Sequence, residues 1–116
     1  MDRGKTRELV ELVDGIIAEA IELGERAGRR VQDVADDVER EARGLRFAVA
    51  EFENAPTAEH LRRSWDDVKA IWARLEESWL LLSLGENGQE THARALRLLA
   101  ALDQECESAV EGEARA

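Results

Sequence analysis

Apolar residues recur every three or four positions through the first half of the chain, and this spacing predicts a helix over residues 6–53. The mean step of this apolar stripe is close to 3.6 residues, the period of a straight α-helix. Opposite charges four residues apart, as in Glu22–Arg26 and Glu39–Arg43, give further support to a helix. The stripe consists of Leu9, Val13, Ile16, Ala20, Leu23, Ala27, Val31, Val34, Val38, Ala42, Leu45, Val49 and Phe52.

The segment from Gly24 to Gly28 is the weak point of this predicted helix. A turn here would divide the segment into two shorter helices and give a four-helix bundle. Residues 24–30, however, contain no Ser, Thr, Asn, Asp or Pro to cap a new helix, and the apolar stripe crosses them without losing phase. The sequence therefore favours one continuous helix, with a kink or break near Gly24–Gly28 as the alternative.

Residues 54–56, Asn-Ala-Pro, end this first helical segment. The residue before a proline is disfavoured in the α conformation, and Pro56 cannot donate a backbone hydrogen bond to continue the helix. Thr57 is then the expected N-cap of a second helix over residues 58–84, and Gly85 is a suitable residue to end it.

A third helix is predicted over residues 88–110. Asn87 followed by Glu90 has the spacing of a capping box, and the acidic residues near the far end should fray the helix there. The short connection makes the second and third helices an antiparallel hairpin. The predicted fold is all-α: a single helical-bundle domain over residues 1–116, with a long N-terminal helix followed by a helical hairpin.

The three tryptophans of the chain, Trp65, Trp72 and Trp79, lie seven residues apart in the second predicted helix. They alternate with aliphatic residues in the heptad pattern of a coiled coil: Leu61, Val68, Leu75 and Leu82. The third helix has a stripe rich in small residues: His92, Ala95, Leu99, Leu102, Cys106 and Ala109. Large rings facing small side chains favour a packed core, and a Trp-lined pocket for an apolar or cationic ligand is the alternative. Each indole N–H also needs an acceptor, so we expect it to reach water or a carboxylate.

A continuous first helix would be too long for the hairpin to cover. It would measure about 70 Å, whereas the hairpin helices would measure about 35–40 Å. The uncovered apolar stripe predicts a homodimer, because soluble monomers rarely expose so large an apolar surface. Small residues near the centre of the helix would let two chains approach closely where they cross, which makes the following residues interface candidates: Ala20, Gly24, Ala27, Gly28 and Val31.

The formal net charge of −10 limits the partners that the chain can attract. Such a surface repels nucleic-acid phosphates and anionic membranes, so we expect neither as a partner. A basic protein surface is the alternative, which would make the chain an acidic inhibitor of the antitoxin or nucleic-acid-mimic type. The longest apolar run extends only from Trp79 to Leu82, and the N-terminus lacks the pattern of a signal peptide, so we expect a cytoplasmic protein.

Catalytic and cofactor chemistry find little support in the sequence. The only histidines, His60 and His92, each lie near the start of a helix, so the hairpin places them at opposite ends and they cannot share a metal. Cys106 is the only cysteine and is expected to pack within the hairpin. We therefore expect no enzyme, no metal and no cofactor. The favoured function is a non-enzymatic interaction or scaffold protein that self-associates through its long helix; the acidic inhibitor and the small-molecule-binding bundle are the alternatives.

Overall fold

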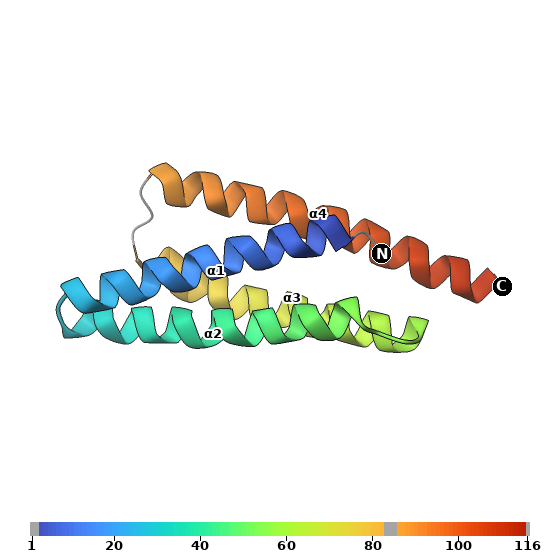
Figure 1. The fold of residues 1–116 in the computed structure, drawn as a ribbon, viewed down its shortest axis with the longest axis horizontal. Coiled ribbons are helices and arrows are strands. Elements are labelled where there is room, and N and C mark those ends of the chain that lie inside the picture. Colours follow the sequence, from blue (N-terminus) through green and yellow to red (C-terminus); the bar gives the residue numbers. More distant parts are fainter. Residues whose placement is uncertain (1–2, 83–85, 116) are drawn as a thin grey trace.

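Four helices account for nearly all of the computed structural model, which describes residues 3–82 and 86–115, with only the backbone at residues 87 and 113–115 (Figure 1). They are α1 (Arg3–Arg26), α2 (Arg29–Glu53), α3 (Ala58–Leu80) and α4 (Glu86–Arg115). Within these described ranges there is no strand, so the prediction of an all-α helical bundle is confirmed. None of the described helices is both long and apolar enough to cross a bilayer.

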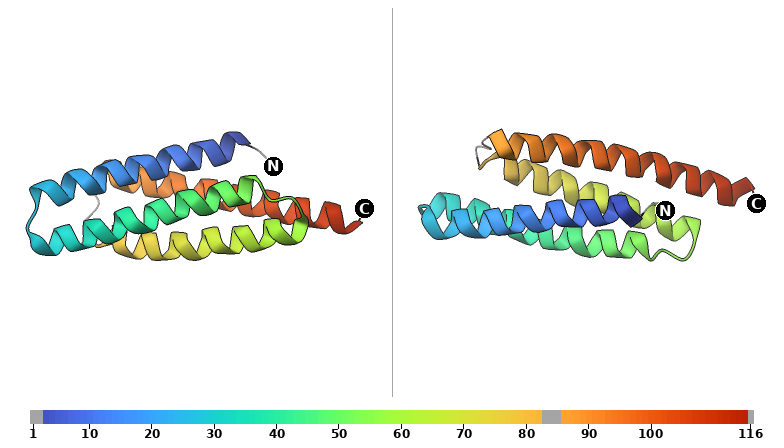
Figure 2. Two further views of the ribbon diagram at one scale, coloured as in Figure 1. Left: turned by 60° about the horizontal axis from the view of Figure 1, so that its bottom comes forward. Right: turned by 45° about the horizontal axis from the view of Figure 1, so that its top comes forward.

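Successive helices run in opposite directions along an elongated bundle of 55 × 22 × 19 Å (Figures 1 and 2). Helix α2 packs closely against α1 and α3, and α4 contacts α3 and α1 to complete the ring of neighbours. The packing of α4 is less close, and its C-terminal end extends beyond the other helices (Figure 1). Two ion pairs connect α4 to α1: Lys5 Nζ lies 2.9 Å from Glu105 Oε1, and Arg94 Nη2 lies 2.8 Å from Glu8 Oε1.

The prediction of one continuous helix over residues 6–53 is wrong. The chain turns at Ala27 and Gly28, and α2 folds back along α1. Gly28 is the N-cap of α2 with ordinary extended angles (φ −67°, ψ 171°), and no side chain caps this end of the helix. The alternative with a break near Gly24–Gly28 is therefore the arrangement observed.

Burial explains why the turn forms where it does. No residue from 21 to 34 is buried, although Leu23, Ala27, Val31 and Val34 continue the apolar stripe in phase. The buried parts of the stripe lie on either side, in α1 up to Ala20 and in α2 from Ala35 onward. Folding at the turn buries these two parts against each other within one chain, a gain that a continuous helix would need a second chain to provide.

The hairpin forms with shifted boundaries. Thr57 caps α3 as predicted, because its Oγ1 accepts a hydrogen bond of 3.1 Å from the His60 backbone N–H. Helix α3 ends at Leu80 rather than at residue 84, and the predicted stop at Gly85 lies outside the described residues. Helix α4 begins at Glu86, so Asn87 lies inside the helix instead of before it, and its side chain is also outside the described set.

The predicted end of the last helix near residue 110 is also wrong, whereas the fraying expected there stays a prediction. Helix α4 continues to Arg115, five residues beyond the predicted end. Alanine, glutamate and arginine are strong helix formers, and here they outweigh the unfavourable placement of acidic residues at the negative end of the helix dipole.

One glycine in α1 has no packing role, and its replacement should stabilise the bundle. Gly15 is exposed, and an added Cβ would meet nothing within 4 Å. Because glycine in a helix interior costs about 1 kcal/mol relative to alanine, Gly15→Ala should raise the free energy of unfolding by about 0.5–1 kcal/mol. Urea denaturation followed by circular dichroism measures the change. The matched control Ala18→Gly, at an exposed position of the same helix, should lower it by a similar amount.

Candidate functional site

The tryptophan heptad forms part of the core. All three indoles are buried, together with Val68 and Leu75. The Trp65 ring lies 5.0 Å from Phe52 of α2, centroid to centroid, and the Trp72 ring packs edge-on against Trp79 at 6.3 Å. Ala95, Leu99, Leu102 and Cys106 of α4 are buried as the small-residue stripe predicts, whereas Ala109 is exposed. The heptad therefore packs as the core hypothesis requires.

Trp65 finds the carboxylate partner expected for an indole N–H. Its Nε1 donates to Asp103 Oδ1 of α4 across 2.6 Å, and Lys69 Nζ lies 3.6 Å from the same oxygen. A hollow of about 190 Å³ opens beside this bond, with Arg62, Trp65, Asp103 and other residues in its walls. Since the bond ties α3 to α4, it serves to position the less closely packed helix.

His92 completes the aromatic cluster at the other end of the hairpin. Its ring stacks on Trp72 at 6.2 Å and meets Trp79 edge-on at 5.8 Å. Its Nε2 lies 2.7 Å from Glu76 Oε2, and both side chains are partly buried. His60 is exposed near the start of α3, far along that helix from Glu76. Within residues 3–82 and 86–115, no group of three or more His, Cys, Asp or Glu side chains could hold a metal ion.

The small residues expected at a crossing of two chains lie where α1 meets α2 of the same chain. Ala20 is buried, and a Cβ added at Gly24 would lie 3.6 Å from Ala35 Cβ, an ordinary van der Waals contact. Ala27 and Gly28 form the turn, and Val31 is 39% exposed just after it. The intermolecular role of these residues stays a prediction, but their close approach is already used within the chain.

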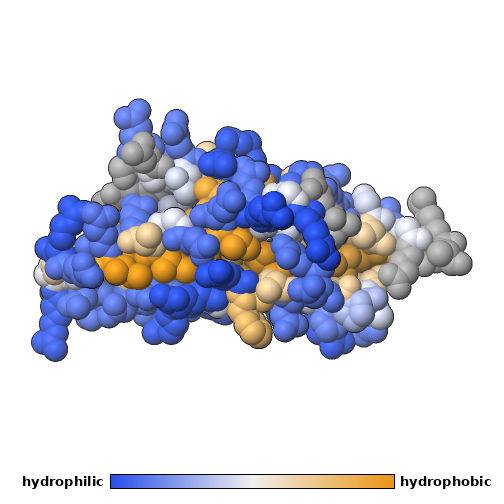
Figure 3. Space-filling model, in the orientation of Figure 1, coloured by the Kyte–Doolittle hydropathy of each residue, from blue (hydrophilic) through white to orange (hydrophobic). Residues whose placement is uncertain are grey.

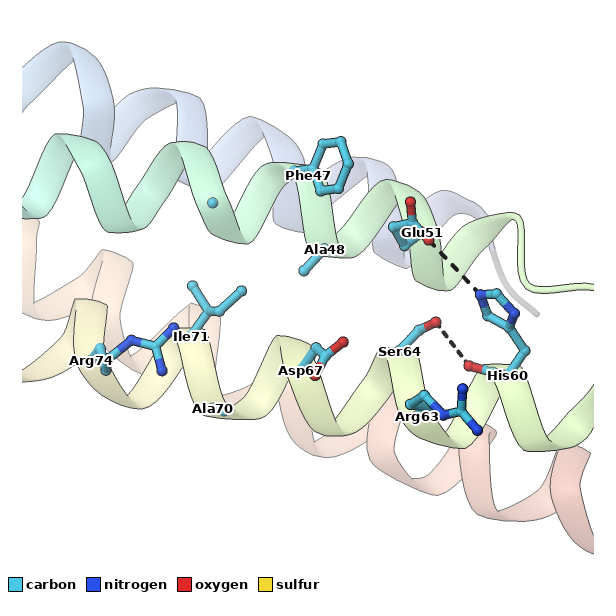
Figure 4. Close-up of a pocket in the computed structure, with 11 residues that line it drawn as sticks. Phe47, Ala48, Glu51, His60, Arg63, Ser64, Asp67, Ala70, Ile71 and Arg74 are labelled. Atoms are coloured by element: carbon cyan, nitrogen blue, oxygen red, sulfur yellow. Dashed lines mark hydrogen bonds and ion pairs between the residues drawn. The ribbon is translucent and has the colours of Figure 1, made fainter.

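A surface feature that the sequence analysis missed lies between α2 and α3. It is a groove of about 400 Å³, called the α2–α3 groove below (Figure 4). Its walls consist of Gly44, Phe47, Ala48 and Glu51 from α2 and His60, Arg63, Ser64, Asp67, Ala70, Ile71 and Arg74 from α3.

Phe47 is the most exposed large apolar side chain among the described residues, at 70%. It projects from α2 away from α3, at the edge of the groove, while Ile71 points from α3 toward α2 (Figure 4). A second hollow of about 220 Å³ shares Phe47, Glu51 and His60 with the groove, so the two hollows adjoin at these residues. An apolar ring in this position costs the isolated molecule hydrophobic free energy and is available for contact with another molecule.

Charged side chains border the groove with both signs. Arg63 pairs with Glu59 at 3.1 Å and Arg74 with Glu41 at 3.3 Å, and His60 Nε2 lies 3.8 Å from Glu51 Oε2. The Asp67 carboxylate, in contrast, makes no ion pair or hydrogen bond to another described residue. The groove thus combines apolar walls with charges that are arranged near the rim.

A second apolar feature of the surface lies near α1. In the view of Figure 3, a band of apolar residues follows the long axis of the molecule and is bordered by hydrophilic residues. Leu96 of α4 and Ile21 of α1 are the exposed large apolar residues of these two helices. Ile21 lines a hollow of about 170 Å³, which is smaller than the α2–α3 groove, so the groove is the better-defined candidate site.

One signal in the sequence could have pointed to Phe47. Its position is two residues after Leu45 and two before Val49, which is about 200° around the helix from each. A phenylalanine on the polar side of an amphipathic helix has no place in the core of its own chain. Its juxtaposition with Ile71 and Arg74 could not be predicted, because it depends on how α2 packs against α3.

No protein-family model matches the sequence, and no curated protein and no solved structure is significantly similar to it.

The bond between Trp65 and Asp103 should contribute measurably to stability. Asp103→Ala leaves the indole N–H without its charged acceptor, and we expect the free energy of unfolding to fall by about 1–2 kcal/mol. Asp66→Ala is the matched control. Asp66 is exposed, and its carboxylate forms only a long surface ion pair of 3.7 Å with Lys69 Nζ, so this substitution should change the free energy of unfolding by less than about 0.5 kcal/mol. Equal effects of the two substitutions in urea denaturation would show that the indole bond contributes nothing specific.

Cys106 should be an unreactive thiol at neutral pH. Burial, and secondarily the nearby Asp103 carboxylate, raise the pKa of the Cys106 thiol above its ordinary value of 9.0. The folded protein should therefore react with a disulfide reagent much more slowly than the urea-unfolded chain. Because the unfolded thiol loses its proton first, stability should fall as pH rises through 9.0. Cys106→Ala should remove that part of the fall, and an unchanged pH dependence in this variant would contradict the assignment.

Proposed function

We propose that this chain is a non-catalytic interaction protein that binds another protein through the α2–α3 groove. The observation that carries the proposal is the exposed ring of Phe47 at the edge of a groove with apolar walls. Aromatic side chains that fill a pocket on a partner are typical of the residues that supply most of the binding energy in protein interfaces.

The hypothesis that the chain self-associates through a long first helix no longer has the observation that motivated it. The apolar stripe of residues 6–53 is covered by the packing of α1 on α2, so no long uncovered helix requires a second chain. The Trp-lined ligand pocket loses support for a related reason, since the three indoles are packed in the core. The α2–α3 groove takes the place of both as the surface that supports an interaction.

Site-specific photocrosslinking tests whether this face contacts a protein. A photoreactive phenylalanine analogue in place of Phe47 should give a discrete adduct with a protein chain in cells, and the groove-filling substitution Ala70→Trp should abolish it. Ala70 is exposed and lines the groove, so this substitution should leave the core intact.

The matched control places the analogue at Leu81. This residue is 69% exposed, nearly as much as Phe47, but it lies at the opposite end of α3 from His60. It should give no discrete adduct. Equal adducts at both positions, or an adduct at position 47 that Ala70→Trp leaves unchanged, would contradict the proposed function.

A further inference from the structure

We propose that this chain also forms a dimer in which two copies exchange α1, because the turn at Ala27–Gly28 can open into one continuous helix. Each α1 then packs on α2 of the other copy, in the contacts that it makes within its own chain. The inference goes beyond the proposed function and does not rest on it, since the α2–α3 groove stays within one chain in both forms. Two features support it: how little holds the turn, and the register of α1 on α2.

The turn has few interactions that hold it in place. No side chain caps α2, and the first turn of this helix contains no acidic residue. Arg29 and Arg30 lie there instead, where the positive end of the helix dipole disfavours them. No residue from 21 to 34 is buried, and a Cβ added at Gly28 would meet nothing within 4 Å. Neither capping nor packing therefore opposes opening of the turn.

The helical hydrogen-bond pattern reaches the turn from both sides. The Ala27 N–H donates to the Leu23 carbonyl at 3.1 Å, and the Gln32 N–H donates to the Gly28 carbonyl at 3.0 Å. In a continuous helix the N–H groups of residues 29–31, which have no partner within α2, would donate to the carbonyls of residues 25–27. Gly28 already has a helical φ of −67°, so at this residue only ψ, now 171°, has to change.

The contact between α1 and α2 can be transferred to a second copy without a change of register. Asp14 Oδ1 lies 3.3 Å from Arg46 Nη1, and a Cβ at Gly24 would lie 3.6 Å from Ala35 Cβ. Both pairs are centred on Arg29–Arg30 in the sequence, so two continuous helices that cross antiparallel at this point restore both pairs between chains. The turn lies beyond the ends of α3 and α4 (Figures 1 and 2), so these helices do not block the crossing.

The crossing also covers apolar residues that one chain leaves open. Leu23 and Ala27 are partly exposed and Val31 is 39% exposed, although all three continue the buried stripe in phase. In the exchanged dimer they face the same segment of the other copy. Exchange of an identical element is a low-cost route to a dimer, because most of its contacts already exist in the monomer, and the two-fold symmetry ends the assembly at two chains.

Sedimentation velocity of protein refolded from urea over a concentration series tests for the dimer. Refolding lets α1 pack either in its own chain or on a second copy, so the dimer fraction should rise with concentration. Gly28→Ala should lower the dissociation constant at least about tenfold, because alanine stabilises a helix interior relative to glycine at both opened turns. Gly15→Ala is the matched control: Gly15 also has nothing within 4 Å but is helical in both forms, so the constant should change less than about twofold.

Arg29→Pro should have the opposite effect. Proline suits the first position of a helix, and the extended angles of Gly28 suit the residue before a proline, so the turn accepts it. Inside a continuous helix it removes a backbone hydrogen bond and clashes with the preceding turn, so the dissociation constant should rise at least about a hundredfold. Arg29→Ala should change it less than about threefold. A wild type that is monomeric at every concentration overturns the inference, as does a dimer that Arg29→Pro leaves unchanged.

Paired cysteines distinguish exchange of α1 from a contact between two closed bundles. Gly24→Cys with Ala35→Cys, in a Cys106→Ala background, places the two Cβ atoms 3.6 Å apart, within the range of a disulfide. After oxidation, the monomer fraction should run as single chains on a non-reducing denaturing gel, and the dimer fraction should run as covalent dimers. A dimer fraction that separates into single chains with internal disulfides overturns the exchange.

Discussion

The contact between α1 and α2 is the interaction on which the rest of the bundle depends. It brings together the two buried parts of the N-terminal apolar stripe, with Val13 and Ile16 on one side and Val38 and Leu45 on the other. Because this contact buries the apolar stripe within one chain, another face of α2 can pack against α3. The outer side of the α2–α3 pair is then left to solvent, and that is where Phe47 lies. The groove is thus a consequence of how the core closes.

The tryptophans fix the second half of the structure. Three large rings on α3 require neighbours of limited size, and α4 supplies alanine, leucine and cysteine at the contact. Trp65 also contacts Phe52, so the heptad connects the hairpin to α2 as well as to α4. The His92 ring contacts both Trp72 and Trp79. Its contact with Glu76 gives the imidazole a polar partner, which offsets the cost of partly burying a polar ring among aromatic side chains.

Sequence periodicity was sufficient for the elements that local patterns determine. The helical class, the end of the first segment before Pro56, the Thr57 cap and the packing of the Trp heptad all follow from spacing and side-chain chemistry, and the structure agrees with them. The turn at Ala27–Gly28 could not be predicted in this way, because it has no capping side chain and the apolar stripe continues through it in phase. What decides between one helix and two is the gain from tertiary burial, which is not a local property. The α2–α3 groove could not be predicted from the sequence for the same reason, since its residues come from two helices whose register is set only by packing.

The looser attachment of α4 has a consequence for how the molecule moves. Helices α1 to α3 are joined by close packing, whereas α4 packs less closely against its neighbours. Polar side-chain interactions also hold α4 in place: the ion pairs Lys5–Glu105 and Arg94–Glu8, and the hydrogen bond from Trp65 to Asp103. Regions with fewer apolar contacts open at lower free energy than the global unfolding of a protein. The bundle is therefore expected to behave as two cooperative units, with α4 detaching first while α1 to α3 stay associated. Its backbone amides would exchange with solvent sooner than those of α2, and the indoles that it covers would be the first part of the core to meet water.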